Sequence, residues 1–582
     1  MRYVLFFFFL FSFSILLSQE KEVSFSQKEI TKNIVTHTDE LIDNDDEILV
    51  RELKGLYFSS SEKKGDKEIY GIVIDDLYVP SPTFFVKKME PFLFHPITWN
   101  GLQEIKKEVI NFYRDNNFPV VHVAIPAGQD ITDGEVHFVV TIGKLGEVKA
   151  EGGEYFSDER TAKIIRTKEG EMIESSRMKQ DLNWINNNPF RSASMVYEAG
   201  KKAGETDVTL YVNDRFPFRV YTGYENNEYN IGGESRCIVG CNWGKVFRFD
   251  QLGNYQFMSA PNPKKWRNHS FSYIIPLPWR HTFKTFGGFS RTKPTPNPNI
   301  DETEPIGQSD FDLNGKGWQL CGRYDVPLTM GNQKNIFTFS GGYDFKRTNN
   351  FVLFDKRLIY TRKIEISQFI FHGDGTLEDR RGMTSFAMDI FFSPGKMTPH
   401  NRDRFFRQER AGATARYYYG TLNLERVTRL FYDCSWYIKG LVQATSTKLL
   451  PSEELSLGGQ YTVRGYKEHE VISDRGALLK NELRTMTFPF FSGMFSSLKK
   501  YRDKEKMQFL AFLDFGWAND IDQNILSKYD TFLLSIGPGV RYSWGMYVNF
   551  RFDYGWQLKD INRLYDEKNS HSRMHLSAIM GF

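Results

Sequence analysis

Two oppositely charged residues in the C-terminal half have the types and surroundings expected of a buried ion pair. Arg464 lies in the segment Leu457 to Tyr466, LGGQYTVRGY, whose glycines allow backbone turns that a side chain would forbid. Asp514 lies in the later segment Phe512 to Gly516, FLDFG, on the polar side of an alternating pattern. A guanidinium presents a planar set of donors that one carboxylate can accept through two hydrogen bonds. The sequence therefore predicts that Arg464 and Asp514 pair and fix a loop to a strand.

Patterns that could support catalysis or metal binding are missing from the sequence. It contains no G-x-S-x-G elbow, H-E-x-x-H helix, P-loop or dinucleotide-binding fingerprint. We interpret His122 and His137, on facing strands of an expected hairpin, as exposed histidines rather than metal ligands. Cys237 and Cys241 lie roughly 13 Å apart along one strand, too far for a disulfide. We therefore expect no enzyme, no cofactor and no metal.

The strands around the proposed pair have one apolar and one charged face. In the strand 507–517, apolar side chains alternate with inward-facing residues that include Gln508, Asp514 and Gly516. Alternation alone also fits a soluble sandwich, because a sandwich buries one face of each strand and exposes the other. Charges of both signs on one face favour a wet barrel lumen instead. The charges that we expect to face the lumen are Lys480, Glu482, Arg484, Arg551 and Asp553.

Composition supports the same interpretation. The 582 residues contain 75 Lys plus Arg and 72 Asp plus Glu, a balance that gives no indication of nucleic-acid binding. Aromatic residues make up 15% of the chain, yet the mean hydropathy is −0.46, which excludes a helical membrane protein. From residue 215 to 582 the pattern is almost entirely of alternating strands, about sixteen of them. The prediction for this part is an all-β transmembrane barrel.

The N-terminus has the pattern of a secretory signal. Arg2 precedes an apolar run from Val4 to Leu17, and cleavage after Ser18 would give a signal peptide over 1–18. The run is too short to span a bilayer, so export followed by insertion as a barrel is the expected membrane route.

The chain between signal and barrel divides into three parts. Residues 19–47 contain a capping box at Ser26 and an expected helix over 26–43, which is either a charged linker or a plug for the barrel. Residues 48–143 and 144–214 each have the pattern of an α+β unit, and the second repeats the strand–helix–helix–strand–strand order in shorter form. In the first unit we expect Asn100 to cap a helix.

VRGY on a long loop, followed by F-x-D-x-G on a later strand, resembles the outer-membrane superfamily that joins periplasmic POTRA modules to a barrel. The segments AIPAGQDITDGEVHFVV and DLNWINNNPFR resemble the sequences of the haemolysin-activator type of TpsB, the transporter of two-partner secretion. The resemblance implies 16 antiparallel strands, POTRA 1 over 48–143, POTRA 2 over 144–214 and a bacterial outer-membrane location, with the POTRA domains in the periplasm. It also implies a loop lock formed by Val463, Arg464, Gly465, Tyr466, Phe512, Asp514 and Gly516.

The C-terminus ends on an aromatic residue. Met574, Leu576 and Ala578 alternate outward before the terminal Phe582, as in the signal by which outer-membrane barrels are recognised for insertion. We therefore expect the barrel-assembly machinery to act on this chain during its biogenesis.

The resemblance implies a transport function. An unfolded partner exoprotein would be captured by the POTRA domains through β-augmentation and secreted through the barrel, which is in contact with outer-membrane lipid. The alternative is an assembly or insertion factor of the same superfamily, which would release its client sideways into the bilayer. A passive pore is a third possibility, and neither nucleic acid nor a cofactor is expected as a partner.

Overall fold

The computed structural model describes residues 48–61, 69–226, 235–247, 249–293, 311–329, 336–354, 357–495, 502–521, 532–560 and 571–582. The predicted signal peptide and the expected helix over 26–43 lie outside these residues. The chain divides into two compact units, one of which contains residues 217–582 and the other the α+β part that precedes it.

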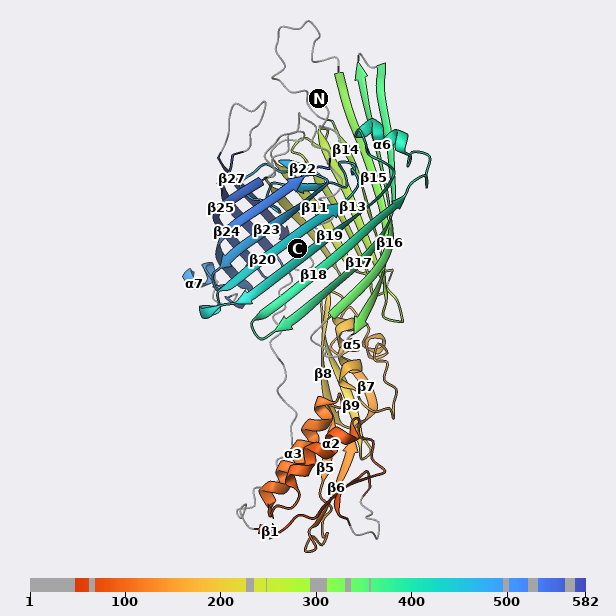
Figure 1. Ribbon diagram of the computed structural model, residues 1–582, viewed down its shortest axis with the longest axis vertical. Helices are drawn as coiled ribbons and strands as arrows, with labels where there is room; N and C mark the ends of the chain where they lie inside the picture. The colour runs from red at the N-terminus through yellow and green to blue at the C-terminus, as the bar shows by residue number, and fades with distance from the viewer. Residues whose placement is uncertain are drawn as a thin grey trace. The chain divides into compact units, whose positions relative to one another are not determined.

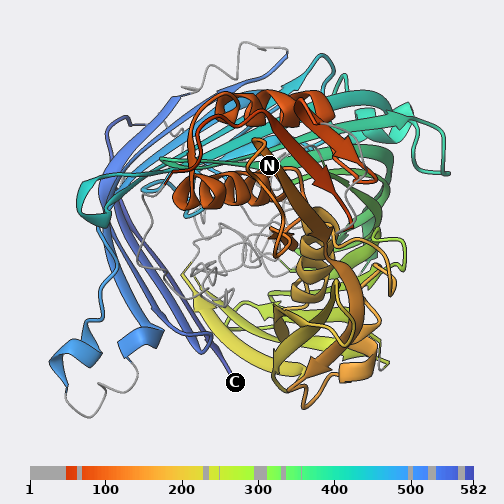
Figure 2. The same ribbon diagram turned by 90° about the horizontal axis from the view of Figure 1, so that it is seen from below.

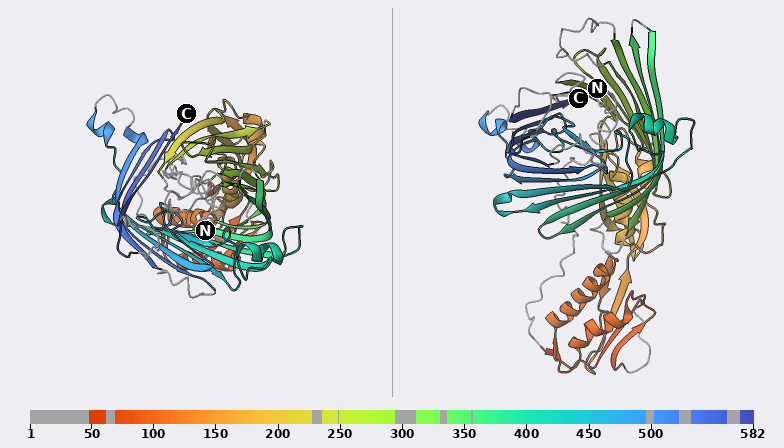
Figure 3. Two further views of the ribbon diagram at one scale, coloured as in Figure 1. Left: turned by 90° about the horizontal axis from the view of Figure 1, so that it is seen from above. Right: turned by 45° about the horizontal axis from the view of Figure 1, so that its top comes forward.

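The C-terminal unit is a closed barrel of 16 antiparallel strands, as the sequence predicts (Figure 1). Figure 2 and the left view of Figure 3 look along the barrel and show its wall of strands. The barrel strands are β10 (Phe218–Glu225), β11 (Arg236–Val246), β12 (Gln251–Ser259), β13 (Trp266–Pro276), β14 (Thr282–Thr292), β15 (Phe311–Thr329), β16 (Ile336–Phe354), β17 (Arg357–Asp379), β18 (Gly382–Pro394), β19 (Arg416–Arg429), β20 (Ser435–Thr445), β23 (Arg475–Arg484), β24 (Glu505–Asn519), β25 (Phe532–Trp544), β26 (Val548–Gln557) and β27 (Ser572–Gly581).

The two ends of the barrel differ in their connections. Because successive strands run in opposite directions, the start of β10 and the end of β27 lie at the same rim. Several connections at this rim are short, such as 277–281, 430–434 and 545–547. The long segment 446–474 connects β20 to β23 at the opposite rim and contains the small hairpin of β21 (Leu455–Leu457) and β22 (Val471–Ser473).

β15, β16 and β17 are the longest strands that the structure describes. β17 has 23 residues, whereas a transmembrane strand needs about 9–11. It pairs with β18 only from Phe369 to Asp379, so its first half extends past β18 at the rim opposite the barrel termini. The segment 395–415, with α6 (Asp403–Glu409), packs against this extension, and the Asn401 amide donates to the Glu365 carbonyl.

The first α+β unit contains a four-stranded sheet in the order β3-β2-β6-β5. Its core includes Phe58, Phe85, Phe112 and Phe138, which are fully buried. The Thr98 hydroxyl accepts from the Gly101 N–H and caps the long helix, so the expectation that Asn100 forms the cap was wrong. The elements are β1 (Ile48–Val50), β2 (Gly55–Ser59), β3 (Gly71–Asp75), α2 (Pro82–Met89), η1 (Glu90–Phe92), β4 (Ile97–Thr98), α3 (Trp99–Asp115), β5 (Val121–Ala124) and β6 (Glu135–Ile142).

The histidine pair of this unit is not a cross-strand pair. His122 lies opposite Thr141, while His137 lies opposite Tyr57 and is buried, with Nε2 2.7 Å from the Ser59 hydroxyl. The interpretation of both histidines as exposed was therefore wrong for His137, which is a hydrogen-bonded core residue.

The second α+β unit contains a three-stranded sheet in the order β7-β9-β8. Two helices cover one face, and Ile185 of the second helix packs there in one core cluster with Leu145 and Leu210 of the sheet. The elements follow the predicted order and are β7 (Lys144–Glu151), α4 (Asp158–Ala162), α5 (Ser175–Asn186), β8 (Arg191–Ala199) and β9 (Glu205–Asp214). Among the described residues of the whole chain, no helix has the length and apolar character needed to cross a membrane.

Candidate functional site: an ion-paired loop in the barrel lumen

The segment 446–474, which we call the lumen loop, folds back into the barrel. After β21 the chain reverses at Gly458 and Gly459, whose φ angles of 104° and 99° favour glycine. The Gly459 N–H donates to the Val463 carbonyl, and the Glu468 carboxylate accepts from the Gln460 N–H. These turns carry Arg464 to the inward faces of the strands that follow the loop in sequence.

Arg464 is fully buried and pairs with Asp514 through two parallel contacts. Its Nε lies 2.6 Å from Oδ2 of Asp514, and its Nη2 lies 2.7 Å from Oδ1. The Arg464 backbone N–H also donates to the same carboxylate. The ring of Phe512 lies 3.6 Å below the guanidinium carbon and adds a cation–π contact. A buried charge is tolerated when such partners replace its hydration, and this geometry supplies them.

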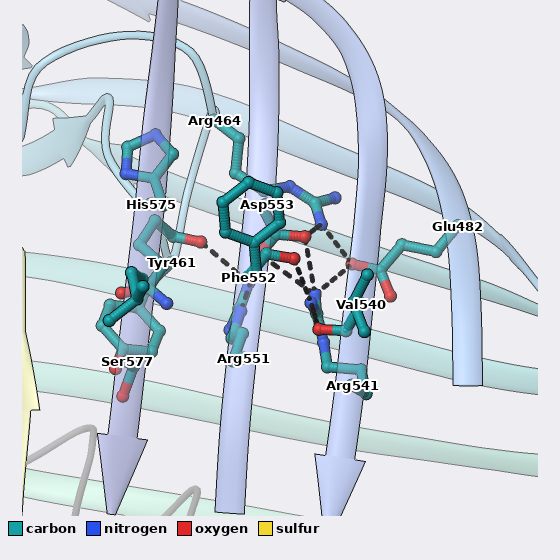
Figure 4. Close-up of polar contacts among 12 residues, drawn as sticks. Tyr461, Arg464, Glu482, Val540, Arg541, Arg551, Phe552, Asp553, His575 and Ser577 are labelled. Atoms are coloured by element: carbon teal, nitrogen blue, oxygen red, sulfur yellow. Dashed lines mark hydrogen bonds and ion pairs between the residues drawn. The ribbon is translucent and has the colours of Figure 1, made fainter. Parts of the chain in front are cut away.

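The pair belongs to a larger network of charges on the lumen wall. Arg464 Nη1 lies 2.7 Å from Glu482 and 3.3 Å from Asp553. Figure 4 shows Arg541 pointing toward Asp553 from the neighbouring strand β25, at 2.9 Å, and Arg551 pointing toward it from the same strand, β26, at 2.8 Å. The network therefore joins β23, β24, β25 and β26 to one loop residue through alternating charges.

Glycines of the neighbouring barrel strands leave room for the residues beside Arg464. A Cβ at Gly516 would lie 2.8 Å from Val463, so this glycine makes room for the buried valine. Gly465, with φ 89°, lies against the backbone of Gly555, and its N–H donates to His575 Nε2 on β27. The Tyr466 hydroxyl donates to the Lys559 carbonyl at 2.6 Å and accepts from the Leu534 N–H at 3.1 Å. The loop tip is thus fixed by shape as well as by charge.

The lumen loop also contacts the first and last strands of the barrel. The Tyr461 hydroxyl donates to the Glu225 carboxylate on β10, and Glu225 lies opposite Ser577 on β27. The β10–β27 seam contains five residue pairs, compared with eight between β10 and β11. Backbone bonds between Val220 and Phe582 extend the seam at its other end.

The start of the lumen loop is attached to the other side of the barrel. Glu453 accepts from Lys346 on β16 at 2.9 Å, from Gln368 on β17 at 3.1 Å and from Tyr419 on β19 at 2.7 Å. Because Glu453 contacts one side of the wall and Arg464 another, the lumen loop crosses the lumen.

A second guanidinium fixes the loop at the rim. Arg410 lies between three carboxylates, at 2.5 Å from Glu454, 2.5 Å from Asp474 and 3.3 Å from Asp520. These acids are close enough together for a metal ion, but the guanidinium already occupies the space between them. Burial raises the pKa of Glu454 to about 8, against the opposing effect of Arg410.

The structure brings together the residues that the sequence singled out for the loop lock. Lys480 donates to the Gln460 carbonyl, and Arg484 pairs with Glu482, so the predicted lumen charges lie beside the lock. Phe582 lies away from this cluster at the barrel seam and is 79% exposed. Sequence reasoning missed Arg541, His575, Tyr461 and Glu453, although Arg541 lies at an inward position of the alternating pattern of β25, a signal that could have indicated it.

A closed barrel of sixteen strands, crossed by an ion-paired loop and preceded by two α+β units, is typical of the class of outer-membrane barrels that carry POTRA domains. Residues 204–542, more than half of the chain, match the model of the family described as haemolysin secretion/activation protein ShlB/FhaC/HecB, and the chain belongs to this family. The match confirms the resemblance to TpsB proteins and the outer-membrane location.

Relatives of known description are similar over parts of the chain. The chain is 26% identical to the heme/hemopexin transporter protein HuxB of Haemophilus influenzae (strain 86-028NP) over 28% of this chain and 30% of that protein. It is 24% identical to the outer membrane transporter CdiB of Escherichia coli O6:K15:H31 over 68% of this chain and 65% of CdiB. The chain thus spans less than two thirds of either relative.

Solved structures share the fold along nearly the whole chain. CdiB from Escherichia coli superposes with a TM-score of 0.70 at 16% identity, over 95% of this chain and 93% of that one. CdiB from Acinetobacter baumannii superposes with a TM-score of 0.64 at 14% identity, over 98% of this chain and 97% of that one.

Proposed function

We propose that this protein captures an unfolded partner exoprotein in the periplasm and secretes it through the barrel to the cell surface. The observation that carries this proposal is the lumen loop, whose Arg464 is attached to strands of the barrel wall by ion pairs. Such contacts can be exchanged for contacts to a passing chain without breaking the barrel sheet. The family description and the name of CdiB, an outer membrane transporter, support the same function.

We propose residues 144–214 as POTRA 2 and the edge of β7 as its capture site. At the start of β7, the Leu145 N–H and carbonyl already bond to Glu171 and Gly170. Beyond a bulge the Glu147 N–H donates to Asp207 on the β9 side. Because successive N–H groups of a strand point in opposite directions, the N–H groups of Val148 and Ala150 point to the outer edge.

A groove runs beside this part of β7. It has a volume of about 460 Å³ and lies between the strand and α4. Val148, Ala150, Ala162 and Ile165 line its apolar part, and charges of both signs lie at its margin. An extended client segment could add to the β7 edge through backbone hydrogen bonds and place alternate side chains in this groove, which requires little sequence specificity.

The opposite edge of the same sheet is already occupied. The Asn186 amide donates to the Ala193 carbonyl at 3.1 Å, and its oxygen accepts from the Ala193 N–H at 2.6 Å. The side chain therefore takes the place of a neighbouring strand on β8. This difference favours β7 over β8 as the edge that receives a client.

A pair of alanine-to-proline variants tests the capture site. Ala150→Pro removes an outward N–H from β7 and adds a ring at the groove, so we expect secretion of the client to fall while the barrel remains inserted. Ala199→Pro makes the matched change on the outer edge of β8 and should leave secretion near the wild-type level. Equal secretion by both variants would contradict capture at β7.

One observation favours a second function, that of an assembly or insertion factor. The five-pair seam between β10 and β27 is a place where a client could leave sideways into the bilayer. Deletion of the gene, followed by comparison of secreted and outer-membrane proteins, separates the two functions. Loss of one exoprotein supports secretion, whereas broad loss of barrel proteins supports assembly.

A further inference from the structure

The connection between β23 and β24 differs from the short connections at the same barrel rim. It begins after Arg484 and ends before Glu505, whereas the connection between β25 and β26 contains only residues 545–547. The described part includes the short helix α7 (Phe491–Met494). Figures 1 to 3 show α7 on the outside of the barrel wall.

The segment 485–495 is firmly attached to the outer wall. The Phe488 N–H donates to the Met507 carbonyl at 2.9 Å, and the Met507 N–H donates back at 2.8 Å. Both oxygens of Glu505 accept from the first N–H groups of α7, at 2.7 Å each, and the ring of Phe491 lies 5.5 Å from that of Tyr542. The apolar side chains of this segment are therefore presented in a fixed position.

These side chains remain open to the surroundings despite the attachment. Their exposed fractions range from 39% to 67%. A soluble surface rarely carries so many contiguous apolar side chains, so the patch indicates a binding surface. We call it the rim patch, and it consists of Met486, Phe490, Phe491, Met494 and Phe495.

The rim patch lies at the edge of the lipid-facing surface, which indicates lipid as its partner. It continues the lipid-facing surface, on which Leu483 and Phe509 are also exposed, toward the periplasmic rim. Arg502, Asp503 and Lys504 follow in the same connection, are all exposed and carry one net positive charge. Apolar side chains combined with basic residues at this depth match the boundary between acyl chains and phosphate groups.

A second copy of the chain fits the patch less well. A stable protein interface buries about 800 Å² on each partner, and five partly buried side chains do not provide that area. We infer that the rim patch is an interfacial anchor that inserts between phospholipids of the periplasmic leaflet. Through β23 and β24 it would hold in the membrane the sector of the wall that carries Glu482 and Asp514.

Photocrosslinking in proteoliposomes tests this inference. The full-length protein with p-benzoylphenylalanine in place of Met494 would be inserted into vesicles of phosphatidylethanolamine and phosphatidylglycerol, irradiated and analysed by mass spectrometry. We expect at least about tenfold more lipid adduct than with the same amino acid in place of Tyr70, an exposed aromatic residue of the periplasmic unit. Heat-modifiable mobility confirms that each variant is folded.

Two outcomes would overturn the inference. The first is crosslinking of position 494 to protein, either to a second copy or to another part of the same chain. The second is a lipid yield at position 494 equal to that at position 70. A variant at Met486 repeats the measurement if position 494 does not tolerate the substitution. None of these results depends on secretion, so failure of the proposed transport function would be seen separately.

Discussion

Arg464 is the residue on which the position of the lumen loop depends most. Replacing it with Ala leaves Asp514, Glu482 and Asp553 without this guanidinium, and removing one partner of a buried pair typically costs about 3–5 kcal/mol. We expect Arg464→Ala to reduce secretion strongly in barrels that are still inserted. Arg416→Ala changes an exposed arginine of β19 and should leave secretion unchanged.

Asp514 should be coupled to Arg464 in a double-mutant cycle. Asp514→Ala leaves Arg464 two other carboxylates, so its secretion defect should be smaller than that of Arg464→Ala. The loss of secretion in the double variant should be smaller than the sum of the losses in the two single variants, because either single change already breaks the pair. Strictly additive losses, measured with folded barrels in all variants, would show that the two residues act independently.

The carboxylates around Arg410 predict that the stability of the protein depends on pH. The pKa of Glu454 is about 8 in the folded protein, whereas an ordinary glutamate has a pKa of 4.5. Between these two pH values the folded state therefore binds one more proton than the unfolded state. The free energy of unfolding should therefore decrease as pH rises through this window. We expect the heat-modification midpoint to be lower at pH 8.5 than at pH 6, and Glu454→Gln to reduce the difference. An equal difference in the variant would assign it to other groups.

The sequence identified Arg464 and Asp514 because both lie in short motifs with glycine and aromatic neighbours. It placed Asp553 on the lumen face but could not pair it with Arg464, and it missed His575, since these residues are 89 and 110 positions from their loop partners and are brought near by barrel register. The burial of His137 was missed for a related reason. Its partner is Ser59 on a parallel neighbouring strand, which the hairpin pattern does not indicate.

At the scale of elements, the lumen loop lies directly against the backbone of β26. A Cβ at Gly555 would lie 2.6 Å from the Gly465 nitrogen, so Gly555→Ala should displace the loop tip. We expect a higher single-channel conductance in planar bilayers. The control is Gly440→Ala on β20, where a Cβ would meet nothing within 4 Å. A rise of equal size in both variants would contradict the proposed displacement.

Most strands could be predicted because inward and outward residues alternate along them, as on β24 and β26. The great length of β17 could not, since its far end leaves the membrane and alternation alone gives no membrane boundary. The cap of α3 shows the same limit on a smaller scale. Thr98 and Asn100 are both suitable capping residues, and only the backbone conformation, extended at Thr98, decides between them.

At the scale of the whole molecule, the C-terminal residue should be needed for assembly. Phe582 exchanges two backbone hydrogen bonds with Val220, so its deletion removes part of the seam as well as the terminal aromatic ring. We expect less heat-modifiable barrel and less surface protection from proteases. Phe582→Tyr keeps both features and should assemble normally, whereas full assembly of the truncated chain would contradict the prediction.

The expected helix over 26–43 can be tested through conductance. Deletion of residues 22–47 should raise the single-channel conductance if this segment plugs the lumen, because a helix with side chains is about 10 Å wide. The lumen loop still crosses the lumen in this variant, so the rise should be smaller than in a combination with Arg464→Ala. Unchanged conductance and unchanged flicker would favour a linker.

The contacts of the lumen loop with Glu225 and His575 connect barrel closure to sealing during biogenesis. These residues lie on the first and last strands and are 350 positions apart, so the loop tip completes its binding site only when the end of the chain has arrived. The contacts of the loop tip with both strands of the seam, unlike those of Arg464 with β23 and β24, therefore depend on closure of the barrel.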